Sequence, residues 1–136
     1  MRLSLNRGTD LAMRALSRLD EAEGALTGSD LAAQIGTTIS FLPQIMSPLI
    51  RRGWVESDRG PGGGYRLTDT AAEASLLDII EATEGSTEDG RCVLRDARCP
   101  EESCPIHLVW MEARRHLVEG FGGIAALETQ HEGVSS

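Results

Sequence analysis

The chain has 136 residues, the usual size of one domain, which excludes a catalytic domain joined to a separate regulatory one. Its hydrophobic fraction of 40% and charged fraction of 25% are typical of globular proteins, and no apolar run approaches the roughly 20 residues of a membrane span. Charged residues interrupt residues 1–19, which excludes a secretory signal, so a cytoplasmic protein without a membrane partner is predicted.

The net charge of -8 is unevenly distributed along the chain. Residues 1–70 hold eight arginines and eight acidic residues, whereas residues 71–136 hold five arginines and thirteen acidic residues. The excess of acid therefore argues against nucleic-acid binding only for the second half. The first half carries a cluster of cations formed by Arg51, Arg52, Arg59 and Arg66. This cluster is either a DNA-facing patch or a solvated surface, and charge alone does not distinguish the two.

Helical spacing of apolar residues predicts two short helices before residue 40. The first runs from a capping Thr9 to about Asp20, and the second follows a capping Ser29 and stops at Gly36. A polar connector separates the two helices.

A third helix is predicted from a cap at Ser40 to Gly53. Its predicted buried stripe consists of Phe41, Leu42, Ile45, Met46, Leu49 and Ile50. Pro48 lies inside this helix and removes one backbone hydrogen bond, so a bend or an early end is expected there. Two short helices joined by a tight turn, the second with polar and cationic residues on its outer face, have the proportions of a helix-turn-helix.

Two short strands around a glycine-rich tip are predicted next, Trp54–Ser57 and Tyr65–Thr68. Four glycines in residues 60–64 let the backbone approach a surface closely, and Arg59 and Arg66 place cations at either side. The pattern predicts a wing, although a plain flexible hairpin has the same composition. A nucleotide phosphate loop is disfavoured, because no Lys-Ser or Lys-Thr follows and no helix begins behind it.

The second half of the chain is predicted to hold two helices with the cysteines between them. Ser75 and Asp78 form a capping box for the first helix, which ends at Gly85. Pro105 opens the second, a long helix whose apolar stripe consists of Ile106, Val109, Trp110, Ala113, Leu117 and Phe121. Such a stripe on so small a chain favours pairing with a second copy over docking on its own domain.

Three cysteines, Cys92, Cys99 and Cys104, and His107 fall within 16 residues. Structural zinc generally uses cysteine pairs two to four residues apart, so gaps of six and four residues favour a larger cluster of several metal atoms. Zinc and a redox-active disulfide stay open as alternatives. The side chain of His107 can point the same way as the Cys104 thiolate, because the two residues are three apart at a helix start. No nucleophile has an evident base, so the chain is not predicted to be an enzyme.

From Met1 to about Leu127 the chain resembles the bacterial winged-helix iron-sulfur regulators that include the Isc, NsrR and RirA repressors. The residues that carry the resemblance are Thr9 to Ala12, Arg59 to Tyr65 in the wing, and the three-cysteine loop before a long helix. The resemblance implies a homodimer joined through the long C-terminal helices, a helix-turn-helix in the major groove and wings near the minor groove.

The resemblance also implies roles for individual residues. Ser40, Gln44 and Arg51 would face bases or phosphates, and Arg59, Gly62 and Gly63 would approach the DNA backbone. Cys92, Cys99 and Cys104 would hold an iron-sulfur cluster, with two or four irons. His107 matches the fourth ligand of the Isc regulator, whereas Asp10 matches a carboxylate that some NsrR proteins supply from the partner subunit. Pro43 departs from the polar residue that the Isc regulator carries there.

The predicted fold is mainly α with a small β-wing: a winged helix-turn-helix plus a long C-terminal dimerisation helix. Residues 1–70 form the DNA-binding region, 71–104 a connecting helix and cysteine loop, 105–127 the dimerisation helix and 128–136 a disordered tail. The predicted function is transcriptional regulation, as a repressor, with affinity for a double-stranded DNA operator controlled by a cluster that senses iron-sulfur status, nitric oxide or redox stress. The alternative is a winged-helix DNA-binding module with a zinc or thiol-redox site instead.

Overall fold

The computed structural model describes residues 4–58, 63–87 and 104–129. Their elements in chain order are α1 (Arg7–Ala22), α2 (Gly28–Ile35), α3 (Leu42–Arg51), β1 (Val55–Ser57), β2 (Tyr65–Leu67), the 3-10 helix η1 (Asp69–Glu73), α4 (Leu76–Glu84), α5 (Pro105–Gly122) and the 3-10 helix η2 (Ala126–Thr129). A single antiparallel pair, β1 with β2, forms the sheet of the described residues. The predicted fold class, mainly helical with a small β-wing, is confirmed.

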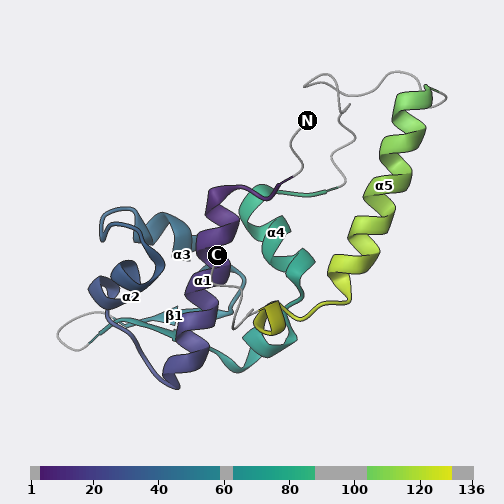
Figure 1. Cartoon of the computed structure of the whole chain (residues 1–136). Coiled ribbons are helices and arrows are strands. Elements are labelled where there is room, and N and C mark those ends of the chain that lie inside the picture. Colours follow the sequence, from purple (N-terminus) through teal and green to yellow (C-terminus); the bar gives the residue numbers. More distant parts are fainter. Residues whose placement is uncertain (1–3, 59–62, 88–103, 130–136) are drawn as a thin grey trace.

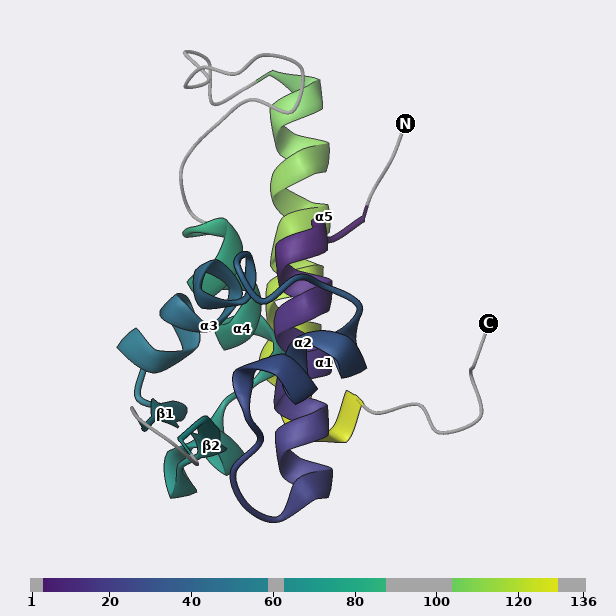
Figure 2. The same ribbon diagram turned by 90° about the vertical axis from the view of Figure 1, so that its left-hand side faces the viewer.

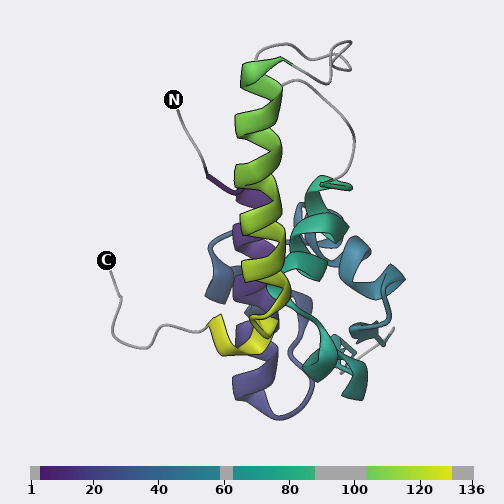
Figure 3. The same cartoon turned by 90° about the vertical axis from the view of Figure 1, so that its right-hand side faces the viewer.

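Helix α1 is the central element of the body, by which we mean all described elements except α5 (Figure 1). It packs against α2, α3, α4, β2 and η2, whereas α5 packs mainly on α4. Figures 2 and 3 show α5 as a long rod beside this body, with its first turns extending beyond the other helices. None of the described helices is long and apolar enough to cross a lipid bilayer.

The core of the body is aliphatic and is assembled around α1. Its larger buried side chains are Leu11, Leu16, Leu19, Leu31, Ile35, Leu42, Ile45, Met46, Leu49, Trp54, Val55 and Ile79. Removing this apolar surface from water is the main force that holds the helices together. The core thus fixes one face of α3 inward and leaves the opposite face outside.

The first two helices begin earlier than predicted. Asn6 caps α1, and its Oδ1 accepts a hydrogen bond of 2.8 Å from the Thr9 N–H. Thr9 is therefore inside the helix and fully buried, where its Oγ1 binds the Glu84 carboxylate and lies 2.6 Å from Thr83 Oγ1. Thr27 replaces Ser29 as the cap of α2, whereas Gly36 ends that helix in the left-handed conformation, as predicted. The predicted capping roles of Thr9 and Ser29 are wrong, because neither residue stands at the extended backbone position where the helix starts.

Helix α3 also differs from its prediction. Ser40 does not cap it; instead Thr38 Oγ1 accepts the Phe41 N–H at 3.1 Å, and the helix starts at Leu42. Phe41 is 43% exposed and Ile50 is 37% exposed, so both lie outside the buried stripe. The helix continues through Pro48 to Arg51, because the core contacts of its inner face outweigh one lost hydrogen bond.

The wing hairpin pairs Val55 with Leu67 and Ser57 with Tyr65. Tyr65 also exchanges two backbone hydrogen bonds with Leu26, of 3.0 and 2.8 Å, which attaches the hairpin to the connector between α1 and α2. At Gly64 a Cβ atom would lie 2.1 Å from the Leu26 carbonyl oxygen. Only glycine fits this close approach, so the base of the predicted wing needs Gly64.

Local contacts fix both the start of α4 and the chain that follows α5. The capping box at Ser75 and Asp78 is confirmed, and α4 ends at Gly85 as predicted. Helix α5 starts at Pro105 and ends at Gly122, before residue 127, where the predicted dimerisation segment ends. The chain then turns, Ala125 bridges to Ser75, and Ala126 is buried in the core. The helix ends here because the glycines at its end destabilise a helix and because the turn allows Ala126 to be buried.

Candidate nucleic-acid interface and cysteine centre

Helix α3 presents a polar outer face. Gln44 and Arg51 are exposed on it, Ser40 is exposed in the turn just before it, and Arg51 Nη1 lies 3.4 Å from Ser47 Oγ one turn earlier. With Ser47 included, these residues follow one another at intervals of four, three and four, which places them opposite the side that Ile45, Met46 and Leu49 bury. The structure therefore brings together the residues of α3 that the sequence predicted to face DNA.

Helix α3 and the turns on either side of it carry positive charges and no negative ones. No Asp or Glu occurs in the sequence between Asp30 and Glu56, whereas Arg51 and Arg52 lie at the end of α3. The guanidinium of Arg52 lies 5.7 Å from the ring centre of Trp54. Because α3 and its turn carry no carboxylate, a polyanion can approach them without repulsion from this stretch.

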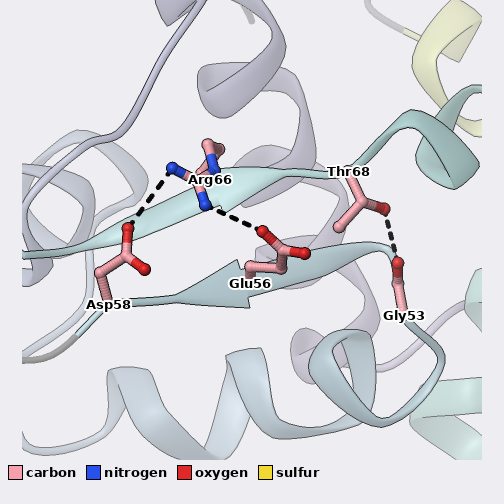
Figure 4. Close-up of polar contacts among 5 residues, drawn as sticks. All are labelled: Gly53, Glu56, Asp58, Arg66 and Thr68. Atoms are coloured by element: carbon pink, nitrogen blue, oxygen red, sulfur yellow. Dashed lines mark hydrogen bonds and ion pairs between the residues drawn. The ribbon is translucent and has the colours of Figure 1, made fainter.

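The wing base contains an ion-pair cluster that sequence reasoning missed (Figure 4). Arg66 Nη2 binds Glu56 Oε2 at 2.9 Å, and Arg66 Nη1 lies 3.5 Å from Asp58 Oδ2. The hydrogen bond to Glu56, with the charges of Asp58 and Glu56, raises the pKa of Arg66 above its usual value. Arg66, which the sequence predicted only as a cation at one side of the tip, is therefore paired with two carboxylates. The alternation of Glu56, Asp58 and Arg66 on facing strands was the signal that could have revealed the pairing.

The wing is also held to the turn that follows α3. The hydroxyls of Thr68 and Thr70 both donate to the carbonyl oxygen of Gly53, at 2.5 and 2.7 Å. Figure 4 shows the first of these bonds beside the Arg66 cluster. Gly53 has a positive φ of 79°, so a turn at this position brings the two elements together. Gly63 lies at the described end of the tip, whereas Arg59 and Gly62 lie outside the described residues.

At the cysteine centre the structure describes Cys104 and His107. Cys104 is the half-buried N-cap of α5 and makes no side-chain capping bond. His107 lies one turn later, and its Nδ1 is buried without a hydrogen-bond partner among the described residues. Cys92 and Cys99 lie outside the described residues. Within the ranges that the structure describes, no three His, Cys, Asp or Glu side chains are grouped as metal ligands.

Arg114 is a functional candidate that sequence reasoning missed. Its Nε donates to the carbonyl oxygen of Thr87, and its Nη2 lies 3.3 Å from Thr87 Oγ1. Thr87 is the last described residue before the segment that carries Cys92 and Cys99. Arg114 follows His107 by seven residues, two helical turns, so both lie on the inner face of α5. The signal in the sequence was an arginine two helical turns after His107, on the same face of the predicted helix.

Asp10 lies elsewhere, in the first turn of α1. Its Oδ2 is 3.1 Å from Arg14 Nη2, and it lines a groove of about 780 Å³ together with the apolar side chains Leu5, Met13, Leu76 and Ile124. The first turns of α1 and α5 are well separated within one chain (Figures 1 and 2). The structure thus keeps the two predicted fourth ligands, His107 and Asp10, on separate elements.

Helix α5 has two apolar faces. Trp110, Val118 and Phe121 are half-buried on the face toward α4, but none of the 18 residues of α5 is buried. The other face consists of Ile106, Val109, Ala113 and Leu117, all exposed; we call these four residues the outer stripe. The predicted single stripe mixed residues from both faces.

Residues 5–125 match the family Rrf2, described as an iron-dependent transcriptional regulator. Over 110 residues the chain is 30% identical to the HTH-type transcriptional regulator IscR of Xenorhabdus nematophila. The matched region covers 81% of this chain and 67% of that protein. The chain is 33% identical over 110 residues to IscR of Photorhabdus laumondii, over 81% of this chain and 66% of the relative. The chain therefore spans about two thirds of the length of these curated relatives.

Solved structures share the fold. CymR, the global cysteine regulator of B. subtilis, superimposes with a TM-score of 0.72 at 22% identity, over 96% of this chain and all of CymR. IscR of T. potens gives a TM-score of 0.71 at 21% identity, over 96% of this chain and 94% of that one. The matching proteins are transcriptional regulators, which confirms that the chain is a DNA-binding regulator and not an enzyme. The chain belongs to the Rrf2 family of transcriptional regulators.

Proposed function

We propose that this regulator acts as a cytoplasmic homodimeric repressor whose operator affinity is controlled by an iron-sulfur cluster held by Cys92, Cys99 and Cys104. The observation that carries the proposal is the buried Nδ1 of His107, one turn after Cys104, which has no hydrogen-bond partner among the described residues. A buried imidazole nitrogen without a partner is costly unless something binds it. The description of the family as iron-dependent supports the same interpretation.

The donors present suit such a group. Thiolates are the usual ligands of iron-sulfur clusters, and an imidazole replaces thiolate in some of them. Cys104 is the half-buried N-cap residue of α5, one turn before His107. Its side chain makes no capping bond to the first turn of α5.

The cluster would supply a centre that responds to iron, oxidants or nitric oxide. Ligation by three cysteines would tie residues 92–104 to the start of α5. Arg114 already joins Thr87 to the middle of that helix, so both ends of the intervening segment would be fixed on one element. The DNA response requires that the bound and free states of the site prefer different dimer geometries.

His107 is the fourth ligand that we favour, and Asp10 is the alternative. His107 lies beside Cys104 on the same helix, whereas the carboxylate of Asp10 is paired with Arg14 on α1. Asp10 lines the groove between α1, α4 and η2, so it would reach a cluster only from a second copy.

A homodimer would cover the apolar surface that one chain leaves open. The outer stripe is exposed, and the groove is open and lined in part by the apolar side chains Leu5, Met13, Leu76 and Ile124. Pairing through the two α5 helices would bury them together, in an isologous interface. Two recognition helices would then read two half-sites of a double-stranded operator.

On DNA, we propose that Ser40, Gln44 and Arg51 contact bases or phosphates and that Arg59, Gly62 and Gly63 approach the backbone. The exposed, carboxylate-free face of α3 supports the first set. The two hydroxyl bonds to the Gly53 carbonyl hold the wing beside α3, which supports the second.

The test is to purify the full chain and its Cys99→Ser variant without oxygen, and to measure iron, sulfide, zinc and the affinity for a selected operator duplex. We expect the wild type to hold iron and sulfide, and the variant to lose both together with the response of DNA binding to nitric oxide. The His107→Ala and Asp10→Ala variants then identify the fourth ligand by the loss of visible absorption. Stoichiometric zinc, or unchanged DNA affinity and nitric oxide response in Cys99→Ser, would overturn the proposal in favour of a zinc or thiol site.

A further inference from the structure

Two large apolar side chains are exposed at the start of the recognition helix. Ile39 is 63% exposed and Phe41 is 43% exposed. In the described residues before α5, the exposed large hydrophobic residues are Leu5, Ile39, Phe41 and Ile50. All but Leu5 lie on α3 or on the turn that precedes it. The DNA-binding body therefore concentrates its exposed apolar surface at the helix-turn-helix.

The turn holds these side chains in defined positions. Thr38 Oγ1 and the Thr38 carbonyl both accept the Phe41 N–H, at 3.1 and 3.2 Å. The Phe41 carbonyl in turn accepts the Gln44 N–H at 3.0 Å. Pro43 has no N–H, so the first turn of α3 offers few backbone donors to a ligand. What this end of α3 presents outward is mainly side chains, and they are apolar at Ile39, Phe41 and Pro43.

Phe41 and Gln44 are three residues apart, so they are neighbours on one face. A glutamine amide in the major groove binds adenine N6 and N7, and the thymine of the same base pair presents its 5-methyl group there. This methyl is the apolar group of the major-groove edge. A face that combines an amide with an exposed aromatic ring therefore matches an A·T pair.

We propose that Phe41 and Ile39 are specificity-determining residues that pack on thymine 5-methyl groups in the major groove, beside an adenine bound by Gln44. DNA is the occupant that the charge favours, because no carboxylate lies between Asp30 and Glu56 and two arginines end α3. The inference rests on DNA binding and is independent of the cluster. It therefore stands or fails separately from the proposal that the cluster controls operator affinity.

The test uses the full chain, purified without oxygen, to select duplexes from a randomised pool. Each thymine of the selected half-site is then replaced by uracil, which removes only the methyl group. Burial of one methyl is worth about fourfold in affinity, so uracil at the contacted position of both half-sites weakens wild-type binding about 15-fold. The change lies in the DNA, so this result does not depend on the folding of a variant.

The Phe41→Ala and Ile39→Ala variants complete the test. Each is expected to bind the thymine duplex more weakly and to lose its own part of the uracil penalty. Ile50→Ala is the matched control, because Ile50 is an exposed isoleucine at the other end of the same helix and should keep the full penalty. Selection of no duplex, half-sites without thymine, no uracil penalty in the wild type, or an unchanged penalty in Phe41→Ala would each overturn the inference. A change of oligomeric state in Phe41→Ala without a change in the uracil penalty would assign this surface to a second copy instead.

Discussion

Helices α1 and α5 are the two longest of the described helices and are built in opposite ways. Helix α1 lies at the centre of the body and buries Thr9, Leu11, Ala12, Ala15, Leu16 and Leu19. Helix α5 is longer, with 18 residues, and buries none of them. The polar side of α5 is satisfied by its own residues, because Arg115 binds Glu112 at 2.5 Å and lies 3.7 Å from Glu119. Among the described residues, nothing covers the outer stripe of α5.

This difference separates the stability of the fold from the stability of the dimer. The elements around α1, including α4 and η2, close one core, so changes there should alter folding. The outer stripe of α5 contributes nothing to that core, so changes there should alter assembly and leave the body folded. Each prediction below tests one side of this division.

The largest effect is expected from Leu16→Ala, in the centre of the body. Leu16 is 2% exposed, and its truncation leaves a cavity that costs about 3 to 4 kcal/mol of the free energy of unfolding. Denaturant unfolding at one fixed protein concentration measures this change. A loss below about 1 kcal/mol would show that the body does not depend on a closed core around α1.

The next effect concerns assembly. Val109 is 71% exposed in the outer stripe, and Val109→Asp would place a charge in the proposed dimer interface. We expect dimerisation to weaken at least 100-fold, about 2.7 kcal/mol, with the helical circular dichroism retained. Sedimentation velocity measures the oligomeric state.

Leu108→Asp is the matched control for this prediction. Leu108 is 57% exposed on the side of α5 that carries Glu112 and Arg115, away from the outer stripe. The control should remain dimeric. Equal dimerisation of both variants would mean that the outer stripe is not the interface.

The smallest effect is expected at the wing. The double change Glu56→Gln with Asp58→Asn releases Arg66 from both carboxylates, so its guanidinium can contact a phosphate. The slope of log affinity against log salt should then steepen by about one per protomer, with a modest gain in affinity at low salt. Adding Arg66→Gln should abolish the change in slope; a slope that stays steep would assign the effect to the removed acids alone.

Much of the fold could be predicted because its signals are local. The capping box at Ser75, the glycine end of α2 and the alternation of the wing strands depend on neighbouring residues only, and all three are confirmed. The cap at Thr9 was mispredicted because its hydroxyl is used by Thr83 and Glu84, which are more than seventy residues away. Such a tertiary contact leaves no mark in the local sequence.

The same reason explains what was missed at the candidate site. Apolar spacing assigned Phe41 to the core, although that position turns outward once Thr38 fixes the preceding turn. Helical periodicity identified α5 as amphipathic but did not separate the face on α4 from the outer stripe, since both are apolar. The cluster ligands stay a prediction from the cysteine spacing and the family resemblance.

Native mass spectrometry of the full chain, purified and sprayed without oxygen, tests the central claim most directly. It weighs the assembly and counts its iron and sulfide at once. We expect a dimer with one iron-sulfur cluster per protomer, and a His107→Ala variant that stays dimeric while its cluster is lost or weakened. A dimer that carries only zinc or no metal would contradict cluster control, and a monomer would contradict pairing through α5.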